Sequence, residues 1–107
     1  HQYTDVYSKV EDLPPAKYNF GAHAKNSLIS SGCIVNGTIE NSVLFKKVYV
    51  GNNAVIKNSI ILNNAYIGDN AYIENCIVES NSTIKADSKF IGEHEVQIVR
   101  EDNPIYT

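Results

Sequence analysis

The chain has 107 residues and a formal net charge of −3, with nine basic and twelve acidic side chains. This length fits a single domain and leaves too little buried surface for a second large lobe. The sequence has one arginine, and Lys46-Lys47 is its one adjacent basic pair, so the clustered basic face of a nucleic-acid-binding protein is not expected.

The sequence also lacks the signals of a membrane or secreted protein. No apolar run approaches the roughly 18 residues that span a bilayer, and the polar residues from His1 to Asp12 do not form a signal peptide. We therefore expect a cytoplasmic protein without membrane contact. Because the chain begins with His1 and contains no methionine, we expect it to be part of a longer protein.

The first 21 residues contain Pro14-Pro15 and three tyrosines but no repeat. They predict an irregular linker or N-terminal cap. A repeat of 17 residues follows, in rows that begin at Ile39, Ile56 and Ile73 and read IENSVLFKKVYVGNNAV, IKNSIILNNAYIGDNAY and IENCIVESNSTIKADSK. A shorter related row runs from Ala24 to Thr38. Self-similarity at a fixed period of this kind predicts a solenoid.

Each row also has a shorter period. Aliphatic residues recur in steps of five or six, at positions 39, 44, 50, 56, 61, 67, 73, 78 and 84, and mostly small residues lie two positions before them. Neither a helix nor a hairpin has this period. A short strand followed by a corner does, and three such units close a triangular coil. Coils that stack at about 4.8 Å, the spacing of paired strands, would place the aliphatic column in the interior.

The corners need residues that tolerate a positive φ angle. We expect Gly51 and Gly68 to serve there, together with asparagine or aspartate at positions 52, 53, 63, 64, 69 and 70. The column Asn41, Asn58 and Asn75 predicts an amide ladder.

The period is lost after Gly92, and the residues from Val96 to Val99 predict a short strand that covers the last coil. The predicted architecture is all-β: a linker or cap over residues 1–21, a parallel β-helix of about four coils over 22–92, and a C-terminal cap over 93–107.

This repeat resembles the hexapeptide repeat of left-handed β-helices, and the expected left hand comes from that resemblance, since ordinary parallel crossovers are right-handed. The order Pro14-Pro15-Ala16-Lys17, Asn26-Ser27-Leu28-Ile29, Gly32-Cys33 and Ser42-Val43-Leu44-Phe45 further resembles the C-terminal domain of the bacterial glucose-1-phosphate adenylyltransferase (ADP-glucose pyrophosphorylase) family. The resemblance extends over residues 3 to 92. It implies a role in glycogen biosynthesis, in which ATP and glucose 1-phosphate yield ADP-glucose and pyrophosphate.

In that family an N-terminal domain carries catalysis, and the β-helix supports subunit contacts and allosteric control. The family's Gly-rich nucleotide loop and acidic metal ligands have no counterpart here, so the resemblance implies that this part holds no catalytic residue and no cofactor. ATP and Mg²⁺ are expected in an upstream nucleotidyltransferase domain, and other subunits of a homo- or hetero-oligomer are the expected partners. Lys89-Phe90-Ile91-Gly92, followed by a charged strand, is similar to the noncatalytic GlgD-type subunit. Whether the parent subunit is catalytic or regulatory stays open.

The same resemblance points to an effector site. In many relatives, two strand positions carry arginines that meet a phosphorylated activator. Here the corresponding stretches contain Glu40 and Glu74, whose charge would repel a phosphate. Lys46, Lys47 and Lys57 then remain as the candidate anion contacts.

A stand-alone hexapeptide acyltransferase is the alternative function. It would need a histidine as general base, and of His1, His23 and His94 only His23 falls near a predicted coil. No loop is inserted between coils, whereas acyltransferases often carry one. The two cysteines, Cys33 and Cys76, have no Cys-x-x-Cys spacing, so we expect small buried thiols and no metal site.

Several large apolar residues fall outside the inward column. Tyr49 and Tyr66 are one row apart, and so are Phe45 and Leu62. Two adjacent coils would therefore repeat an apolar stripe on the outside of the prism. A stacked stripe predicts a contact with another subunit or with the catalytic domain, although these side chains could instead simply cover one another.

Overall fold

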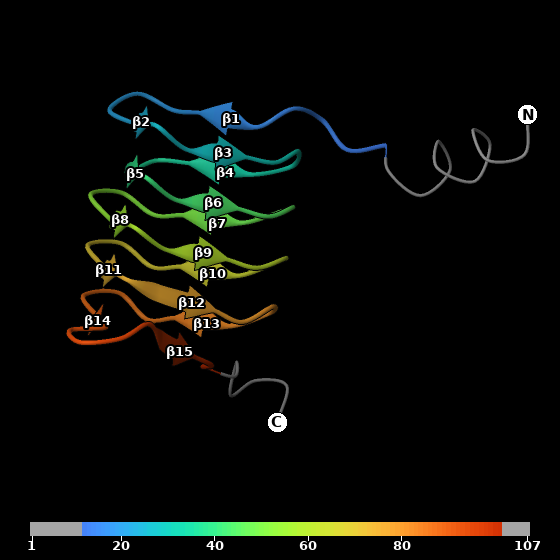
Figure 1. The fold of residues 1–107 in the computed structure, drawn as a ribbon. Coiled ribbons are helices and arrows are strands. Elements are labelled where there is room, and N and C mark those ends of the chain that lie inside the picture. Colours follow the sequence, from blue (N-terminus) through green and yellow to red (C-terminus); the bar gives the residue numbers. More distant parts are fainter. Residues whose placement is uncertain (1–11, 102–107) are drawn as a thin grey trace, which may run out of the picture.

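The computed structural model describes residues 12–101, which form a prism of five stacked coils (Figure 1). Each coil gives one strand to each of three parallel sheets, here named A, B and C. Sheet A contains β1 (Lys17–Tyr18), β4 (Ile34–Val35), β7 (Tyr49–Val50), β10 (Tyr66–Ile67) and β13 (Thr83–Ile84). Sheet B contains β2 (His23–Lys25), β5 (Thr38–Glu40), β8 (Val55–Lys57), β11 (Tyr72–Glu74) and β14 (Lys89–Ile91). Sheet C contains β3 (Leu28–Ile29), β6 (Val43–Leu44), β9 (Ile60–Ile61), β12 (Cys76–Val78) and β15 (Gln97–Val99).

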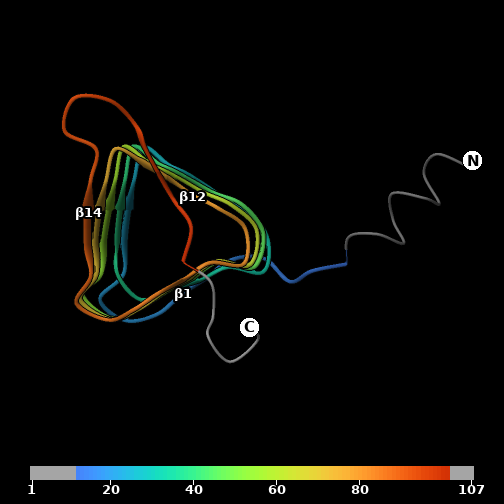
Figure 2. The ribbon, with the colours of Figure 1, turned by 90° about the horizontal axis from the view of Figure 1, so that it is seen from below.

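The predicted left hand is confirmed. Figure 2 looks along the prism from its C-terminal end and shows its triangular cross-section. From the side of β1, the chain runs clockwise to the side of β14 and then to the side of β12, while it advances toward the viewer. A chain that turns clockwise as it approaches describes a left-handed coil.

The number of coils differs from the prediction, because the solenoid has five coils and not about four. β1 pairs with β4 through Lys17 and Ile34 and adds one strand before residue 22, while β15 adds one strand after residue 92, so that together they complete the fifth coil. The sequence hid β1 because its inward position holds Tyr18 in place of an aliphatic residue. The strand predicted near the C-terminus is confirmed as β15, which pairs with β12.

The predicted inward column is the core. Each aliphatic residue of this column is in register with its partner one row later, as in Val50, Ile67 and Ile84. All nine predicted positions have an exposed fraction of 0%: Ile39, Leu44, Val50, Ile56, Ile61, Ile67, Ile73, Val78 and Ile84. Burying each side chain stabilises the fold by about 1.5–3 kcal/mol, so this column is a main source of the domain's stability.

The small residues before this column include a buried ladder of hydroxyl groups. Ser59 Oγ donates to the carbonyl of Lys57 at 2.7 Å and accepts the backbone N–H of Cys76 from the next coil at 3.1 Å. Ser42 repeats both contacts, with Glu40 at 2.7 Å and with the N–H of Ser59 at 3.0 Å. Each hydroxyl thus satisfies a backbone N–H of the next coil and adds a second hydrogen bond to a carbonyl that also accepts the N–H of Asn75 or Asn58.

Most of the positive-φ positions at the described corners hold asparagine, and neither of the two predicted glycines is among them. Asn53, Asn64 and Asn70 have φ angles of 62°, 64° and 62°, as predicted. The column Asn41, Asn58 and Asn75 also adopts positive φ, and its first member accepts a hydrogen bond from Asn26 Nδ2 at 2.6 Å. The other three predicted corner positions, 52, 63 and 69, do not have positive φ.

The expectation that Gly51 and Gly68 take positive φ is wrong, because neither adopts that conformation. Their role is close approach between coils. A Cβ atom on Gly68 would lie 2.6 Å from the backbone nitrogen of Ala86, and one on Gly51 would lie 2.7 Å from that of Asp69. Both distances are shorter than real Cβ contacts, so only glycine fits.

Candidate functional site

The structure places the candidate anion-binding residue Lys57 on a different side of the prism from the other two candidates, Lys46 and Lys47. Lys46 and Lys47 lie in the corner that leads from sheet C to sheet A, after β6 and before β7. Lys57 ends β8 on sheet B. The lysines are thus not brought together in one site, and Lys47 takes part in the corner itself, with a φ angle of 60°.

Lys57 belongs to a row of alternating charges on the outer face of sheet B. Lys25, Glu40, Lys57 and Glu74 follow one another in register from strand to strand. Because neighbouring strands lie about 4.8 Å apart, each of the two inner charges has an opposite charge on both sides. Such a row is close to neutral overall, which weakens the attraction of Lys57 for an external anion.

Tyr72 lies beside this row. Its hydroxyl donates to Glu74 Oε1 at 2.7 Å, and the hydrogen bond, followed by desolvation, raises the pKa of the Tyr72 hydroxyl above its ordinary value. The ammonium groups of Lys57 and Lys89 lie 6.0 and 5.9 Å from the centre of the Tyr72 ring, within cation–π range. The polar groups of sheet B are therefore largely engaged with one another.

The predicted apolar stripe divides between two sheets. Tyr49 and Tyr66 lie on the outer face of sheet A, where their rings stack with centroids 4.7 Å apart and an interplanar angle of 13°. Phe45 and Leu62 follow β6 and β9 at the edge of sheet C, each directly after a buried strand residue. Tyr66 and Phe45 are 46% and 40% exposed. The two pairs therefore flank the corner between sheets C and A.

A second apolar surface, on sheet C, was not anticipated from the sequence. The outer face of sheet C carries one aliphatic residue from every strand, in register along the whole prism: Leu28, Val43, Ile60, Ile77 and Ile98. Leu28 and Ile98 are 71% and 62% exposed, and Ile60 is 38% exposed. The signal was present as a second aliphatic residue just before each buried one, as in Ile60-Ile61.

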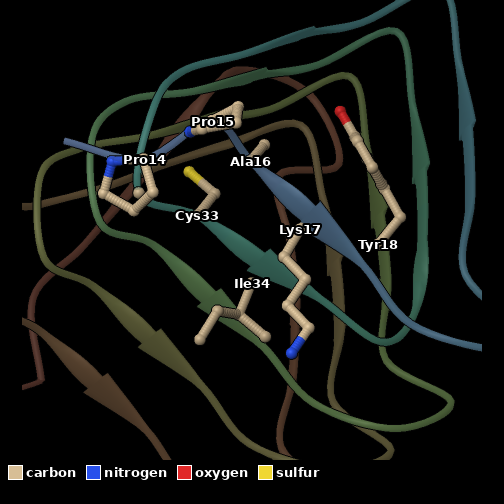
Figure 3. Close-up of a pocket in the computed structure, with 8 residues that line it drawn as sticks. Pro14, Pro15, Ala16, Lys17, Tyr18, Cys33 and Ile34 are labelled. Carbon is tan, nitrogen blue, oxygen red and sulfur yellow. The ribbon is translucent and has the colours of Figure 1, made fainter.

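A pocket of about 550 Å³ lies where the chain enters the solenoid (Figure 3). It is lined by residues 14–18 and 32–34. Figure 3 shows the sulfur of Cys33 facing the segment Pro14 to Ala16, while Lys17 and Ile34 point away from it. Neither His23 nor His94 lines the pocket, so it lacks the base that acyl transfer would need.

Both cysteines are buried, as predicted, with exposed fractions of 1%. Burial raises the pKa of the Cys33 and Cys76 thiols above the ordinary value. Cys33 Sγ donates to the carbonyl of Phe45 at 2.9 Å. Because the thiolate is the nucleophilic form, these thiols suit packing and not covalent catalysis.

The side chains that could bind a metal ion are not clustered in the described residues. Among residues 12–101, no three histidine, cysteine or acidic side chains lie close enough to hold a metal ion. His23 is exposed on β2, in register with Thr38. Within the same described range, no helix is long and apolar enough to cross a membrane.

Comparison with known proteins agrees with this fold. A family model described as "GlmU-like, C-terminal hexapeptide" matches residues 14–101. The glycogen biosynthesis protein GlgD of Geobacillus stearothermophilus is 50% identical over 50 residues, which cover 47% of this chain and 15% of that protein. GlgD of Bacillus subtilis is 48% identical over 46 residues, which cover 43% of this chain and 13% of that protein. The glucose-1-phosphate adenylyltransferase of Pseudothermotoga lettingae is 45% identical over 49 residues, which cover 46% of this chain and 12% of that protein. The matched part of this chain therefore spans no more than 15% of the length of these relatives.

Proposed function

Because the chain belongs to the family of GlmU-like C-terminal hexapeptide domains, we propose that it is the C-terminal assembly and regulatory domain of a glucose-1-phosphate adenylyltransferase subunit. The similarity to GlgD and to that enzyme carries the proposal. In this proposal an upstream nucleotidyltransferase domain binds ATP and Mg²⁺ and converts glucose 1-phosphate to ADP-glucose. The protein then works in the cytoplasm, in a complex with other subunits.

The organisation of the prism supports a role in association. Its interior is filled by aliphatic side chains and serine hydroxyls that bond to the backbone. The thiols are buried, which raises their pKa, and the pocket at the N-terminal end has no histidine in its lining. What the chain presents to its surroundings is three flat faces of different polarity, and flat faces suit contacts with other protein surfaces.

A GlgD-type regulatory subunit fits the charges of sheet B. Glu40 and Glu74 occupy the two positions at which the resemblance implies arginines in activator-binding relatives. Each lies in register between neighbours that include Lys57. A phosphorylated sugar that approached this face would meet as many negative charges as positive ones in that row, and we therefore propose that this subunit does not bind such an activator through sheet B.

The 107-residue chain is expected to show no turnover with ATP and glucose 1-phosphate, and none with acyl-CoA donors. Among the described residues, the pocket of about 550 Å³ has no histidine in its lining, and the smaller pocket that His94 lines lies beyond the last full coil, at the C-terminal cap. Product formation followed by chromatography would check both. Acetyl transfer that disappears in His23→Ala, while Lys25→Ala on the same strand keeps it, would contradict the proposal and establish the acyltransferase alternative.

A further inference from the structure

We propose that Asn26 is a site of spontaneous deamidation, and that the solenoid protects the same dipeptide in its later coils. Asparagine deamidates when the backbone nitrogen of the following residue attacks the carbon of its carboxamide. The chain contains four Asn-Ser pairs, which begin at Asn26, Asn41, Asn58 and Asn81. Because the reacting residues are the same in all four, a difference in their rates reports chiefly on the structure around them. This inference is independent of the proposed function.

The backbone N–H that follows the asparagine is engaged in three of the four pairs. The N–H of Ser42 donates to Ser27 Oγ at 3.1 Å, and the N–H of Ser59 donates to Ser42 Oγ at 3.0 Å. The N–H of Ser82 donates to the carbonyl of Glu79 at 3.3 Å. A nitrogen held in a hydrogen bond must give up that bond before it attacks, which raises the barrier to the reaction.

The first pair lacks this protection. Asn26 and Ser27 connect β2 to β3 in the first coil (Figure 1), and the ladder of serine hydroxyls begins with Ser27. Among residues 12–101, no group accepts the N–H of Ser27. The side chain of Asn26 is also exposed to water. The nitrogen of Ser27 is therefore available for the attack.

Backbone conformation does not distinguish the pairs, but packing does. The asparagines of the first three pairs have φ angles of 52°, 50° and 49°. The inward residue of β2 is Ala24, which is exposed, whereas its partner Ile39 in the next coil has an exposed fraction of 0%. Less buried apolar surface holds the first coil in place, so its corner reaches the geometry of attack more readily.

The reaction needs only water. A bond forms between the Ser27 nitrogen and the carboxamide carbon of Asn26, the bond from that carbon to Nδ2 breaks, and ammonia leaves with the proton of the Ser27 nitrogen. Water then opens the succinimide ring at either carbonyl and gives aspartate or isoaspartate. Both products lose the hydrogen bond that Asn26 Nδ2 donates to Asn41 Oδ1 at 2.6 Å, because an ionised carboxylate has no proton to donate. Isoaspartate also lengthens the main chain at this corner, so deamidation loosens the first coil.

Mass spectrometry of the 107-residue chain tests the proposal. The protein is incubated at mildly alkaline pH, and tandem mass spectra of its tryptic peptides give the rate of deamidation at each asparagine. We expect Asn26 to react at least about fivefold faster than Asn41 and Asn58, which converts to about 1 kcal/mol of barrier, the net strength of an ordinary hydrogen bond. Equal rates at the three positions would overturn the proposal.

Ser27→Ala tests the cause, because it removes the oxygen that accepts the N–H of Ser42. In this variant Asn41 should react at least about threefold faster than in the parent chain, as expected from the loss of one hydrogen bond. Asn58 should keep the parent rate, since the nitrogen that follows it still donates to Ser42 Oγ. Ser27→Thr keeps a hydroxyl and is the matched control, in which Asn41 should also keep the parent rate.

Circular dichroism shows whether both variants are folded at the temperature of incubation. An unchanged rate at Asn41 in folded Ser27→Ala would contradict the protective role of the hydrogen bond. Equal acceleration at Asn41 and Asn58 would count against it as well, because the substitution frees only the nitrogen of Ser42.

Discussion

Ile67→Asp is expected to leave the domain unfolded at room temperature. Ile67 has an exposed fraction of 0% and is stacked between Val50 and Ile84, with no polar side chain at the same position in either neighbouring coil. A carboxylate there has no partner and costs several kcal/mol. The substitution also removes a burial worth about 1.5–3 kcal/mol. Together these losses approach the roughly 5–15 kcal/mol that stabilises a typical domain.

Tyr66→Asp is the control for this prediction, because Tyr66 is the preceding residue of β10 and points outward. It should lose only the stacking on Tyr49, about 0.5–1.5 kcal/mol, and keep a cooperative melting transition. Far-ultraviolet circular dichroism against temperature measures both variants. A melting curve for Ile67→Asp that coincides with the parent curve would show that this column does not face the interior.

Gly68→Ala is expected to destabilise the domain by about 2–3 kcal/mol, at the upper end of overpacking costs. The added Cβ would lie 2.6 Å from the nitrogen of Ala86 and 2.8 Å from the carbonyl oxygen of Ile84. Both are backbone atoms of the next coil and cannot rotate away. Urea denaturation at constant temperature gives the free energy of unfolding for the comparison.

Substitution of Gly32 and Gly68 by asparagine distinguishes a glycine needed for its positive φ angle from one needed because the next coil is too close. Gly32 has a φ angle of 78°, and the nearest atom to an added Cβ is the flexible Cγ of Lys47 at 3.2 Å. Asparagine tolerates that conformation, so Gly32→Asn should cost less than about 1 kcal/mol. Gly68→Asn should be at least as harmful as Gly68→Ala. If Gly68→Asn were instead harmless, the clash between coils would not be the reason for glycine at this position.

The repeat made the solenoid predictable because the same physical demand recurs in every coil. An interior residue must fill the same space above its neighbour, so the aliphatic column Ile39, Ile56 and Ile73 recurs at a fixed offset. The end coils were predicted less completely, because β1 and β15 have a neighbouring coil on one side only and their residues are less constrained. The inward position of β1 can hold Tyr18, which is 52% exposed, and so breaks the pattern. The conformation of Gly51 and Gly68 was predicted wrongly because glycine is needed for two different reasons. It allows a positive φ angle, and it fits where there is no room for a Cβ atom, and the sequence alone does not distinguish the two.

The candidate surfaces were less accessible to sequence reasoning. Pairs one row apart were correctly placed in columns, as the stacked Tyr49 and Tyr66 demonstrate. The sequence did not reveal on which of the three faces a column lies, because that depends on where each corner falls within a coil. The aliphatic face of sheet C therefore emerged only from the strand register. Lys57 likewise lies far along the coil from Lys46 and Lys47, because the corners place it on sheet B and place the other two between sheets C and A.

The rate of ADP-glucose formation tests the central claim most directly. The longer protein that contains this chain is added to the catalytic glucose-1-phosphate adenylyltransferase subunit of the same organism, up to equimolar amounts. We expect the rate to change by at least about fivefold, in the range of ordinary coupling between sites, and we expect the Ile67→Asp variant to have no effect. A rate that stays constant, with both proteins folded, would contradict the account of this chain as a regulatory and assembly domain.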